Sequence, residues 1–269
     1  MAIMNFPEKI MLWPDGAPFG ENGDGYQPFL ERFPVDSASP AGAVIVMPGG
    51  GYQQKMVTYE GRDVCRRLNE YGLHAFMLDY RVAPNHHPAQ LADAAEAVRT
   101  VRRNSKIWKI KPDKIAVLGF SAGGHLSGTI CVHYKWAEEL VPAKDGISAR
   151  PDAGILCYAV LTTGNFGHMG SSKKLLGDPP PADLLRKMSL EKNVHGDMPP
   201  MFLWHTATDA LVPVENSLLF SSALSREKVP FELHVYPQGP HGMGMAVGDP
   251  SVSTWMDLCI KWLKKNDFL

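Results

Sequence analysis

Short apolar runs alternate along the chain with longer amphipathic segments. Six runs are predominantly hydrophobic, and they cover residues 43–47, 73–78, 114–120, 153–160, 201–204 and 231–236. Continuous hydrophobicity, in place of polar and apolar alternation, is typical of strands buried on both faces of a parallel sheet. Two weaker strand candidates lie earlier in the chain, near residues 10–13 and 29–33. The pattern therefore predicts a mostly parallel central sheet that is covered on both faces.

The segments between these runs have the period of helices. An apolar stripe at helical spacing consists of Leu91, Ala94, Ala95, Val98 and Val101. Further helices are predicted over residues 59–71, 124–134, 212–225 and 251–265, and Gly72 ends the first of them. Strands that alternate with helices predict an α/β fold with right-handed crossovers and helices on both faces of the sheet.

Residues 162–199 interrupt this alternation. They are rich in Gly, Pro, Lys and Ser, and we interpret them as a small insertion over one end of the sheet. No internal repeat and no linker divides the remaining chain. The sequence therefore predicts one domain, residues 1–269, with a small insertion in place of a large lid.

Composition excludes several classes of protein. The 269 residues carry 27 basic and 28 acidic side chains, so the net charge is -1 and nucleic acid is not expected as a partner. The longest apolar stretch, near residues 153–161, is too short to span a bilayer, so no membrane partner is expected. Four widely separated cysteines predict buried, reduced thiols, and residues 1–12 lack the pattern of a signal peptide. We therefore expect a cytoplasmic protein.

A G-x-S-x-G motif covers residues 119–123, with Ser121 at its centre. An apolar run precedes the motif and a helical pattern follows it, so the serine lies at a predicted strand-to-helix turn. Such a turn exposes the hydroxyl at the end of a sheet, and the following helix N-terminus favours developing negative charge. The alternative is a serine that caps the helix between glycines required for close packing. The context favours a nucleophile.

A nucleophilic serine requires a base and a carboxylate that orients the base. Among the ten histidines, His241 lies in the glycine-rich loop 237–242, directly after the last apolar run. Asp209 leaves the preceding run and is the favoured acid, with helix capping as its alternative role. Asp197 and Asp249 have the right order in sequence but follow no convincing strand. The order Ser121, Asp209, His241 is the order of the α/β hydrolases.

The glycine-rich segment 48–51 follows another apolar run. Consecutive glycines let backbone N–H groups turn toward one point without a side chain in the way, which suits an oxyanion hole. The alternative is a flexible linker or a phosphate-binding loop. A dinucleotide motif fails because Gln54 occupies the position of its last glycine.

These motifs resemble those of small esterases of the α/β-hydrolase superfamily, on the hormone-sensitive-lipase-like side. The general match lies in residues 48–51, 79–84 and 119–124. A narrower resemblance to bacterial acetyl-xylan-esterase-like carbohydrate esterases lies in residues 168–171, 175–177, 199–206, 212–217, 231–234 and 239–242. Together the motifs cover nearly the whole chain from about residue 40 onward.

The resemblance implies roles for particular residues. It implies Ser121, Asp209 and His241 as the catalytic triad. It also implies that the backbone N–H groups of the oxyanion hole come from Gly50, Gly51 and Ala122. One departure from the broader family is Pro48, where many lipases have a histidine that supports the glycine loop. This departure concerns the rigidity of the loop and leaves the chemistry intact.

Candidate substrate contacts are less strongly specified, and they comprise Tyr52, Glu60, Phe166 and His168. For Glu60, a solvated helix face is favoured over a position at the mouth of the site. Arg81, at a strand end, is expected to pair with a buried carboxylate, in preference to contacting substrate. Trp13, Trp204 and Tyr52 are candidates for an apolar wall, with a core position as the alternative for Trp204.

The predicted function is hydrolysis of short acyl esters, with removal of acetyl groups from a sugar or xylo-oligosaccharide as the favoured reaction. The alternative enzyme is an arylformamidase, which would need an aromatic slot in the insertion. A peptidase is disfavoured because no peptide-selecting domain is visible, and a non-catalytic binding module is disfavoured by the complete triad. No metal or cofactor is expected. The sequence leaves the oligomeric state open, a homo-oligomer included.

Overall fold

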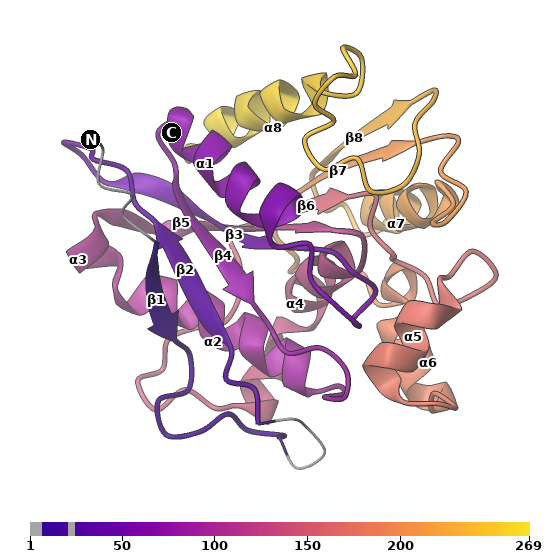
Figure 1. Ribbon diagram of the computed structural model, residues 1–269, viewed down its shortest axis with the longest axis horizontal. Helices are drawn as coiled ribbons and strands as arrows, with labels where there is room; N and C mark the ends of the chain where they lie inside the picture. The colour runs from indigo at the N-terminus through magenta and orange to yellow at the C-terminus, as the bar shows by residue number, and fades with distance from the viewer. Residues whose placement is uncertain (1–6, 21–24) are drawn as a thin grey trace.

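The computed structural model describes residues 7–20 and 25–269. Eight strands form one sheet in the order β1-β2-β4-β3-β5-β6-β7-β8 (Figure 1). β2 is antiparallel to both of its neighbours, whereas the pairs from β4 to β8 are parallel. The strands are β1 (Glu8–Met11), β2 (Phe29–Phe33), β3 (Ala41–Met47), β4 (His74–Asp79), β5 (Ile110–Phe120), β6 (Ala153–Cys157), β7 (Met201–Thr206) and β8 (Phe231–Tyr236). The predicted mostly parallel sheet is confirmed.

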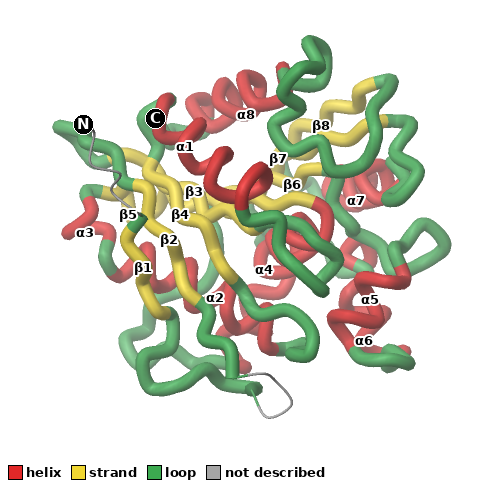
Figure 2. Tube along the Cα trace, viewed as in Figure 1, coloured by secondary structure: helices red, strands yellow, loops and turns green. Residues whose placement is uncertain are grey.

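Helices cover both faces of this sheet (Figure 2). They are η1 (Thr58–Arg62), α1 (Asp63–Glu70), α2 (Ala89–Arg103), α3 (Ser105–Trp108), α4 (Ser121–Leu140), α5 (Met169–Leu176), α6 (Ala182–Met188), η2 (Leu190–Lys192), α7 (Glu215–Arg226) and α8 (Thr254–Lys265). Buried residues of α1 and α8 pack on one face, and those of α2, α4 and α7 pack on the other. Each face therefore carries its own apolar core.

Side chains of the central strand β3 show how one run supplies both cores. Ile45 and Met47 point into the layer shared with α2 and α4, while Val44 and Val46 point into the layer shared with α1 and α8. All four are fully buried. Because successive strand residues face opposite sides, a strand covered on both faces must be apolar at every position.

Some boundaries differ from the sequence prediction. β1 begins at Glu8 and ends at Met11, two residues before the predicted end. β6 ends at Cys157, three residues before the predicted end, because Tyr158 has a positive φ of 36° and turns the chain out of the sheet. α7 begins only at Glu215 and α8 only at Thr254. Backbone turns that local apolar patterns do not reveal cause these differences.

The helix predicted over residues 59–71 is divided into two kinds of helix. Residues Thr58–Arg62 form a π-helical turn, and the α-helical part runs over Asp63–Glu70. A π turn rotates side chains relative to the spacing of an α-helix, and such turns occur often at functional sites. The rotation matters for Glu60, as described below.

Residues 162–199 form a compact segment with α5, α6 and η2, beside the carboxyl ends of the parallel strands (Figure 1). Histidine side chains bind its backbone carbonyl groups. His133 Nε2 lies 2.8 Å from the Lys187 oxygen, and His125 Nε2 lies 3.0 Å from the Met188 oxygen. These contacts hold the segment against α4.

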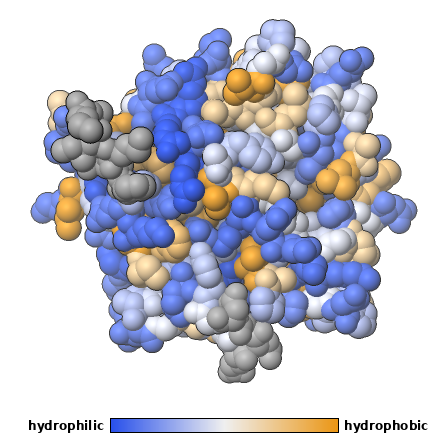
Figure 3. All heavy atoms as spheres, viewed as in Figure 1, coloured by the Kyte–Doolittle hydropathy of each residue, from blue (hydrophilic) through white to orange (hydrophobic). Residues whose placement is uncertain are grey.

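On the face drawn in Figure 3, hydrophilic side chains surround small, separated apolar patches. Scattered apolar residues of this kind are normal on folded proteins. The four cysteines are all buried and free, as predicted. Within residues 7–20 and 25–269, none of the helices has the length and apolar character needed to cross a membrane.

Candidate active site

Ser121 directly follows the end of β5 and is the first residue of α4, with a positive φ of 52°. Two glycines make this turn sterically feasible. A Cβ atom on Gly119 would lie 2.1 Å from the Gly123 carbonyl oxygen, and one on Gly123 would lie 2.1 Å from the Met47 carbonyl oxygen. Only glycine therefore fits at both positions, and the predicted strand–serine–helix turn is confirmed.

His241 connects Ser121 to Asp209. Its Nε2 atom lies 2.8 Å from the Ser121 Oγ, and its Nδ1 atom lies 2.7 Å from the Asp209 Oδ2. Because Nδ1 faces a carboxylate, this nitrogen carries the proton and Nε2 is left to accept one from the serine hydroxyl. The arrangement can therefore remove a proton from Ser121 as the oxygen attacks an electrophile.

Asp209 is held by several donors in a buried position. Its Oδ1 accepts hydrogen bonds from the backbone N–H groups of Leu211 at 3.0 Å and Val212 at 2.9 Å. Burial opposes ionisation, but hydrogen bonds from His205, His241 and the Val212 N–H outweigh burial and hold the pKa of Asp209 well below its usual value. The carboxylate fixes the turn that precedes α7, but no described side chain caps α7, so the alternative role in helix capping was wrong.

Two other histidines near the site have partners other than Ser121, and the Nε2 atom of one of them, His205, also lies 3.4 Å from the Asp209 Oδ2. His205 is fully buried, with Nδ1 2.8 Å from the Ser217 hydroxyl and Nε2 2.9 Å from the Val212 carbonyl oxygen. His125 lies in the first turn of α4 and points away from Ser121. Neither ring makes a hydrogen bond to the serine hydroxyl.

The glycine loop after β3 adopts a conformation that glycine permits. Gly50 and Gly51 have φ values of 131° and 66°, and a Cβ atom on Gly50 would lie 2.2 Å from the Gln54 carbonyl oxygen. Within the part of the chain that the structure describes, no acceptor binds the N–H groups of Gly50, Gly51 or Ala122. The N–H group of Ala122 belongs to the first turn of α4, where such groups have no partner within the helix. These donors are therefore available to an external anion.

Glu60 differs from its predicted position. The sequence favours a solvated helix face, but the side chain is only 2% exposed and lines the same pocket as Ser121. Its Oε2 accepts a hydrogen bond from the Gly49 N–H at 2.8 Å, and its Oε1 accepts one from the Tyr158 hydroxyl at 2.6 Å. Burial raises the pKa of Glu60, while these hydrogen bonds act in the opposite direction. The π-helical turn directs this side chain inward, so the prediction of a solvated face was wrong.

We call the cavity in front of Ser121 the open pocket. Its free volume is about 180 Å³, and it is lined by Gly50, Gly51, Glu60, Ser121, His168 and His241, together with Tyr59 and Leu211 at its rim. His168 is thus at the pocket as predicted, with its Nδ1 2.7 Å from the Ser171 hydroxyl. The pocket is the part of the structure where a substrate can reach the serine.

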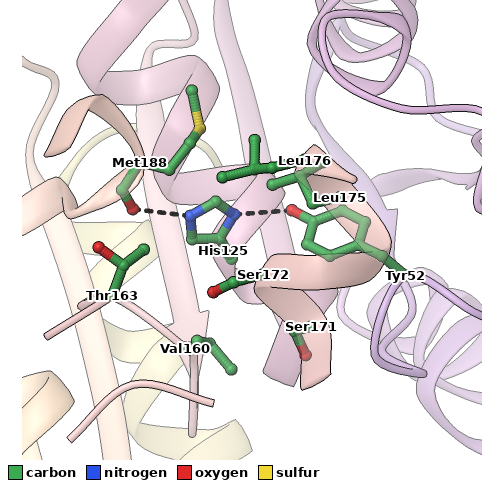
Figure 4. A pocket seen from close by; sticks show the side chains of 9 residues that line it. All are labelled: Tyr52, His125, Val160, Thr163, Ser171, Ser172, Leu175, Leu176 and Met188. Atoms are coloured by element: carbon green, nitrogen blue, oxygen red, sulfur yellow. Dashed lines mark hydrogen bonds between the residues drawn. The ribbon is translucent and has the colours of Figure 1, made fainter. Parts of the chain in front are cut away.

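A second, much smaller cavity adjoins the open pocket, and we call it the side cavity (Figure 4). Its free volume is about 10 Å³, room for about one water-sized sphere. Ser171 lines both cavities. In the side cavity, the Tyr52 hydroxyl donates a hydrogen bond of 2.7 Å to His125 Nδ1, and Leu176 and Met188 supply apolar walls (Figure 4).

Several of the predicted substrate contacts do not line the open pocket. Tyr52 faces the side cavity and is absent from the lining of the open pocket. Phe166 is 40% exposed and lines neither cavity. The proposed apolar wall does not form, because Trp204 is fully buried in the core and Trp13 Nε1 donates to Asp93. The direction of these side chains depends on packing partners that are far away in the sequence.

Arg81 is a buried pairing partner, as predicted. Its guanidinium and the Asp93 carboxylate are both essentially inaccessible to solvent, and their closest nitrogen and oxygen atoms are 2.7 Å apart. The pair lies away from both cavities.

Sequence reasoning missed several residues at the site. Tyr59 and Leu211 are exposed by 41% and 53% at the rim of the open pocket. Ser171 lies between the two cavities. The Tyr158 ring packs against the His241 imidazole, and its hydroxyl oxygen accepts the Gly244 N–H. For Tyr158, the available signal was its place within the predicted apolar run 153–160. Among the described side chains, no group of three His, Cys, Asp or Glu residues could hold a metal ion.

Known proteins share this architecture. The acetylxylan esterase of Xylanibacter ruminicola is 32% identical over 212 residues, which are 77% of this chain and 42% of that protein. Endo-1,4-beta-xylanase B of Butyrivibrio fibrisolvens is 37% identical over 257 residues, which are 94% of this chain and 40% of that protein. The chain thus spans only about 40% of the length of these curated relatives.

A solved structure matches over the full length. The acetyl ester-xyloside bifunctional hydrolase from Caldicellulosiruptor lactoaceticus has a TM-score of 0.93 and 41% identity, and the match covers 100% of both chains. A family model described as the alpha/beta hydrolase fold matches residues 44–245, which contain Ser121, Asp209 and His241. The protein therefore belongs to the family of the alpha/beta hydrolase fold.

Proposed function

We propose that this protein is a serine esterase that removes short acyl groups, acetyl above all, from a sugar or xylo-oligosaccharide. One observation carries the proposal. Ser121, His241 and Asp209 form a hydrogen-bonded chain with links of 2.8 and 2.7 Å, beside backbone N–H groups that have no acceptor in the described structure. A nucleophile, an oriented base and donors for a developing oxyanion are the parts that acyl transfer requires.

In the proposed reaction, the Ser121 oxygen attacks the ester carbonyl carbon while His241 Nε2 accepts the hydroxyl proton. Asp209 holds the Nδ1–H tautomer and stabilises the imidazolium that forms. The N–H groups of Gly50, Gly51 and Ala122 bind the oxyanion. His241 then donates its proton to the leaving alcohol oxygen. Water, activated by the same histidine, releases the acyl group from Ser121 as a carboxylic acid.

The two cavities suggest how the ester is oriented. The leaving alcohol must contact His241, which lines the open pocket, so the sugar occupies that pocket. The acyl group must point to the other side of the serine. We assign the acyl group to the side cavity, whose wall residue Val160 donates a backbone hydrogen bond of 3.2 Å to the Ser121 carbonyl oxygen. A cavity of about 10 Å³ suits an acetyl methyl group.

The ester bond is favoured over the glycosidic bond as the bond that is cleaved. Glycoside hydrolysis with two carboxylates needs both of them at the sugar. Among the described residues that line the open pocket, Glu60 is the only carboxylate. The names of the acetylxylan esterase and of the acetyl ester-xyloside hydrolase support an acetylated sugar as the substrate class.

The test is acetate release from acetylated xylo-oligosaccharides, with Ser121→Ala as the matched inactive control. We expect acetate from these substrates and p-nitrophenol from p-nitrophenyl acetate. N-formylkynurenine and p-nitrophenyl xyloside serve as the substrates of the competing reactions. Turnover of N-formylkynurenine with no acetate release would reassign the enzyme as an arylformamidase. Xyloside cleavage that survives Ser121→Ala would require a second site.

We also infer that this region acts as one domain in a reducing compartment such as the cytoplasm. The single eight-stranded sheet supports one domain, and four buried, free cysteines support a compartment in which thiols stay reduced. Oxidant-free purification with thiol titration under denaturing conditions tests the second inference, with four thiols expected.

A further inference from the structure

We propose that Glu60 and Tyr158 are positioning residues. They hold the glycine loop after β3 (the oxyanion loop) and the loop that contains His241 (the histidine loop) in a fixed arrangement relative to each other. The inference rests on the proposed esterase function and assigns a role to two buried groups that the reaction itself does not consume. Neither residue exchanges a proton or forms a bond with substrate. Their role is to fix where the N–H donors and the imidazole stand relative to Ser121.

The first link joins Glu60 to the glycine loop. Glu60 Oε2 accepts the Gly49 N–H at 2.8 Å, and Gly49 immediately precedes the two glycines proposed to bind the oxyanion. The loop is also closely packed at this point. A Cβ atom on Gly49 would lie 2.7 Å from Glu60 Oε2 and 3.0 Å from the Ser121 Cβ. The carboxylate thus fixes the peptide that leads into the donors, directly beside the nucleophile.

The second link joins Tyr158 to the histidine loop. The Gly244 N–H donates to the Tyr158 oxygen at 2.8 Å, three residues after His241. The Tyr158 ring packs edge-on against the His241 imidazole, with ring centroids 5.0 Å apart and an interplanar angle of 71°. Trp255 Nε1 donates to the Gly244 carbonyl oxygen at 3.1 Å and holds the same loop from the other side.

The two links meet in one hydrogen bond. The Tyr158 oxygen accepts from Gly244, and its own hydroxyl proton points to Glu60 Oε1 at 2.6 Å. Both oxygens of Glu60 therefore accept hydrogen bonds, which is what allows a carboxylate to remain in a site that is only 2% exposed. A continuous chain of hydrogen bonds runs from Gly49 through Glu60 and Tyr158 to Gly244.

This series of hydrogen bonds connects two loops that are almost 200 residues apart in the sequence. Both loops must act on the same carbonyl group. Oxyanion donors stabilise a transition state only if they are in place before charge develops. A misplacement of about 1 Å can lower a rate by about 100-fold. Loss of these hydrogen bonds should therefore weaken transition-state stabilisation and leave the binding of the ground-state ester almost unchanged.

The experiment compares Glu60→Ala, Glu60→Gln and Tyr158→Phe with the wild type, on p-nitrophenyl acetate. Glu60→Ala is expected to lower kcat by about 100-fold while KM changes less than about threefold. Glu60→Gln keeps an oxygen that can accept the Gly49 N–H, so it retains more activity than Glu60→Ala. Tyr158→Phe lowers kcat by about 10-fold. In the double variant, the two losses do not add, because both residues belong to one chain.

Two matched controls are available away from the site. Asp152 accepts a backbone N–H from Ile115 at 2.9 Å and a side-chain donor from Arg102 at 2.8 Å, as Glu60 does with its own partners, but near the opposite end of β5. Tyr71, at the C-terminal end of α1, donates its hydroxyl to the Asp257 carboxylate at 2.5 Å, as Tyr158 does to Glu60. Asp152→Asn and Tyr71→Phe should keep kcat within about twofold of the wild type.

Binding of a trifluoromethyl ketone separates positioning from simple damage to the fold. The ketone adds to a serine as a tetrahedral adduct and occupies the oxyanion hole, so its Ki should rise in parallel with the fall in kcat/KM. A folded Glu60→Ala enzyme with kcat and Ki within twofold of the wild type overturns the inference. So does a fall in kcat that active-site titration attributes entirely to inactive protein. Should Glu60→Ala fail to fold, the near-isosteric Glu60→Gln and Tyr158→Phe variants decide by the same criteria. A wild-type protein that cleaves no ester overturns the proposed function itself, before any variant is compared.

Discussion

Replacing Met188 with alanine should change the acyl preference of the proposed esterase. Met188 is 1% exposed, lines the side cavity and supplies the carbonyl oxygen that His125 binds. The substitution removes the three heavy atoms beyond the Cβ and leaves the backbone oxygen in place. It therefore lengthens the side cavity without touching Ser121, His241 or the glycine loop. In the wild type, we expect kcat/KM to fall from acetate to butyrate to octanoate, because little room exists beyond a methyl group.

The size of the effect follows from the area that a longer chain can bury. A butyryl group has two more methylenes than an acetyl group, and each buried methylene contributes about 0.8 kcal/mol. If both fit the enlarged cavity, the gain is about 1.6 kcal/mol, or about 15-fold in the ratio of kcat/KM for butyrate to that for acetate. The same deletion should lower the free energy of unfolding by about 2–5 kcal/mol, since it removes buried packing.

The assay measures kcat/KM for p-nitrophenyl acetate, butyrate, hexanoate and octanoate, with urea denaturation in parallel. Met256→Ala is the matched control, because Met256 is 4% exposed in α8 and packs in the core on the other face of the sheet. It should lose stability in the same range and keep the acyl profile of the wild type. A Met188→Ala enzyme that loses stability but keeps the wild-type butyrate-to-acetate ratio would refute our assignment of the side cavity. A wild-type profile that rises toward octanoate would refute it as well.

Three further outcomes are expected. Ser121→Ala should lower kcat by about 10⁶ with little change in melting temperature, and more than a few per cent of residual activity would contradict a nucleophilic role. His241→Ala should remove nearly all rate, whereas a folded but inactive His205→Ala would show that the base is misassigned. Burial lowers the pKa of His125 to about 4. Below about pH 6.5 the unfolded chain therefore binds a proton that the folded protein excludes, and His125 by itself should lower the free energy of unfolding by up to about 3 kcal/mol between pH 6.5 and 4. Urea denaturation measures that loss, which should be smaller in His125→Gln, and an unchanged stability at pH 4 would contradict it.

Local sequence predicted the strands of the fold because a strand that is buried on both faces is apolar at successive positions. β3, residues 75–78 of β4 and residues 115–120 of β5 are continuously apolar where the sheet is covered by two helical layers, and the runs identified them. The G-x-S-x-G turn was recognisable for a similar reason. A Cβ atom on Gly119 or Gly123 would lie 2.1 Å from a backbone carbonyl oxygen, so the turn requires glycines two residues on either side of Ser121.

The order of chemistry-bearing residues could also be predicted. In a parallel sheet, every strand ends at the same edge, so Ser121, Asp209 and His241, each shortly after a strand, were expected to meet. The structure brings them into one hydrogen-bonded chain. Arg81 followed the same logic, since a charge at the end of a buried strand requires a partner, and Asp93 supplies it.

Only the tertiary structure decided where the side chains around the triad of Ser121, His241 and Asp209 point. Glu60 looked solvated because its position was judged by α-helical spacing, whereas a π turn directs it inward onto Gly49. Tyr52 follows the glycine loop in sequence, yet its hydroxyl reaches His125 in the side cavity, 73 residues away. The Tyr158–Glu60 hydrogen bond spans 98 residues. Such pairings depend on how separate elements pack and on small backbone rotations, and neither leaves a periodic signal in the sequence. The chain by itself therefore determined the sheet and the residues able to do the chemistry, while packing between distant segments determined the shape of the site around them.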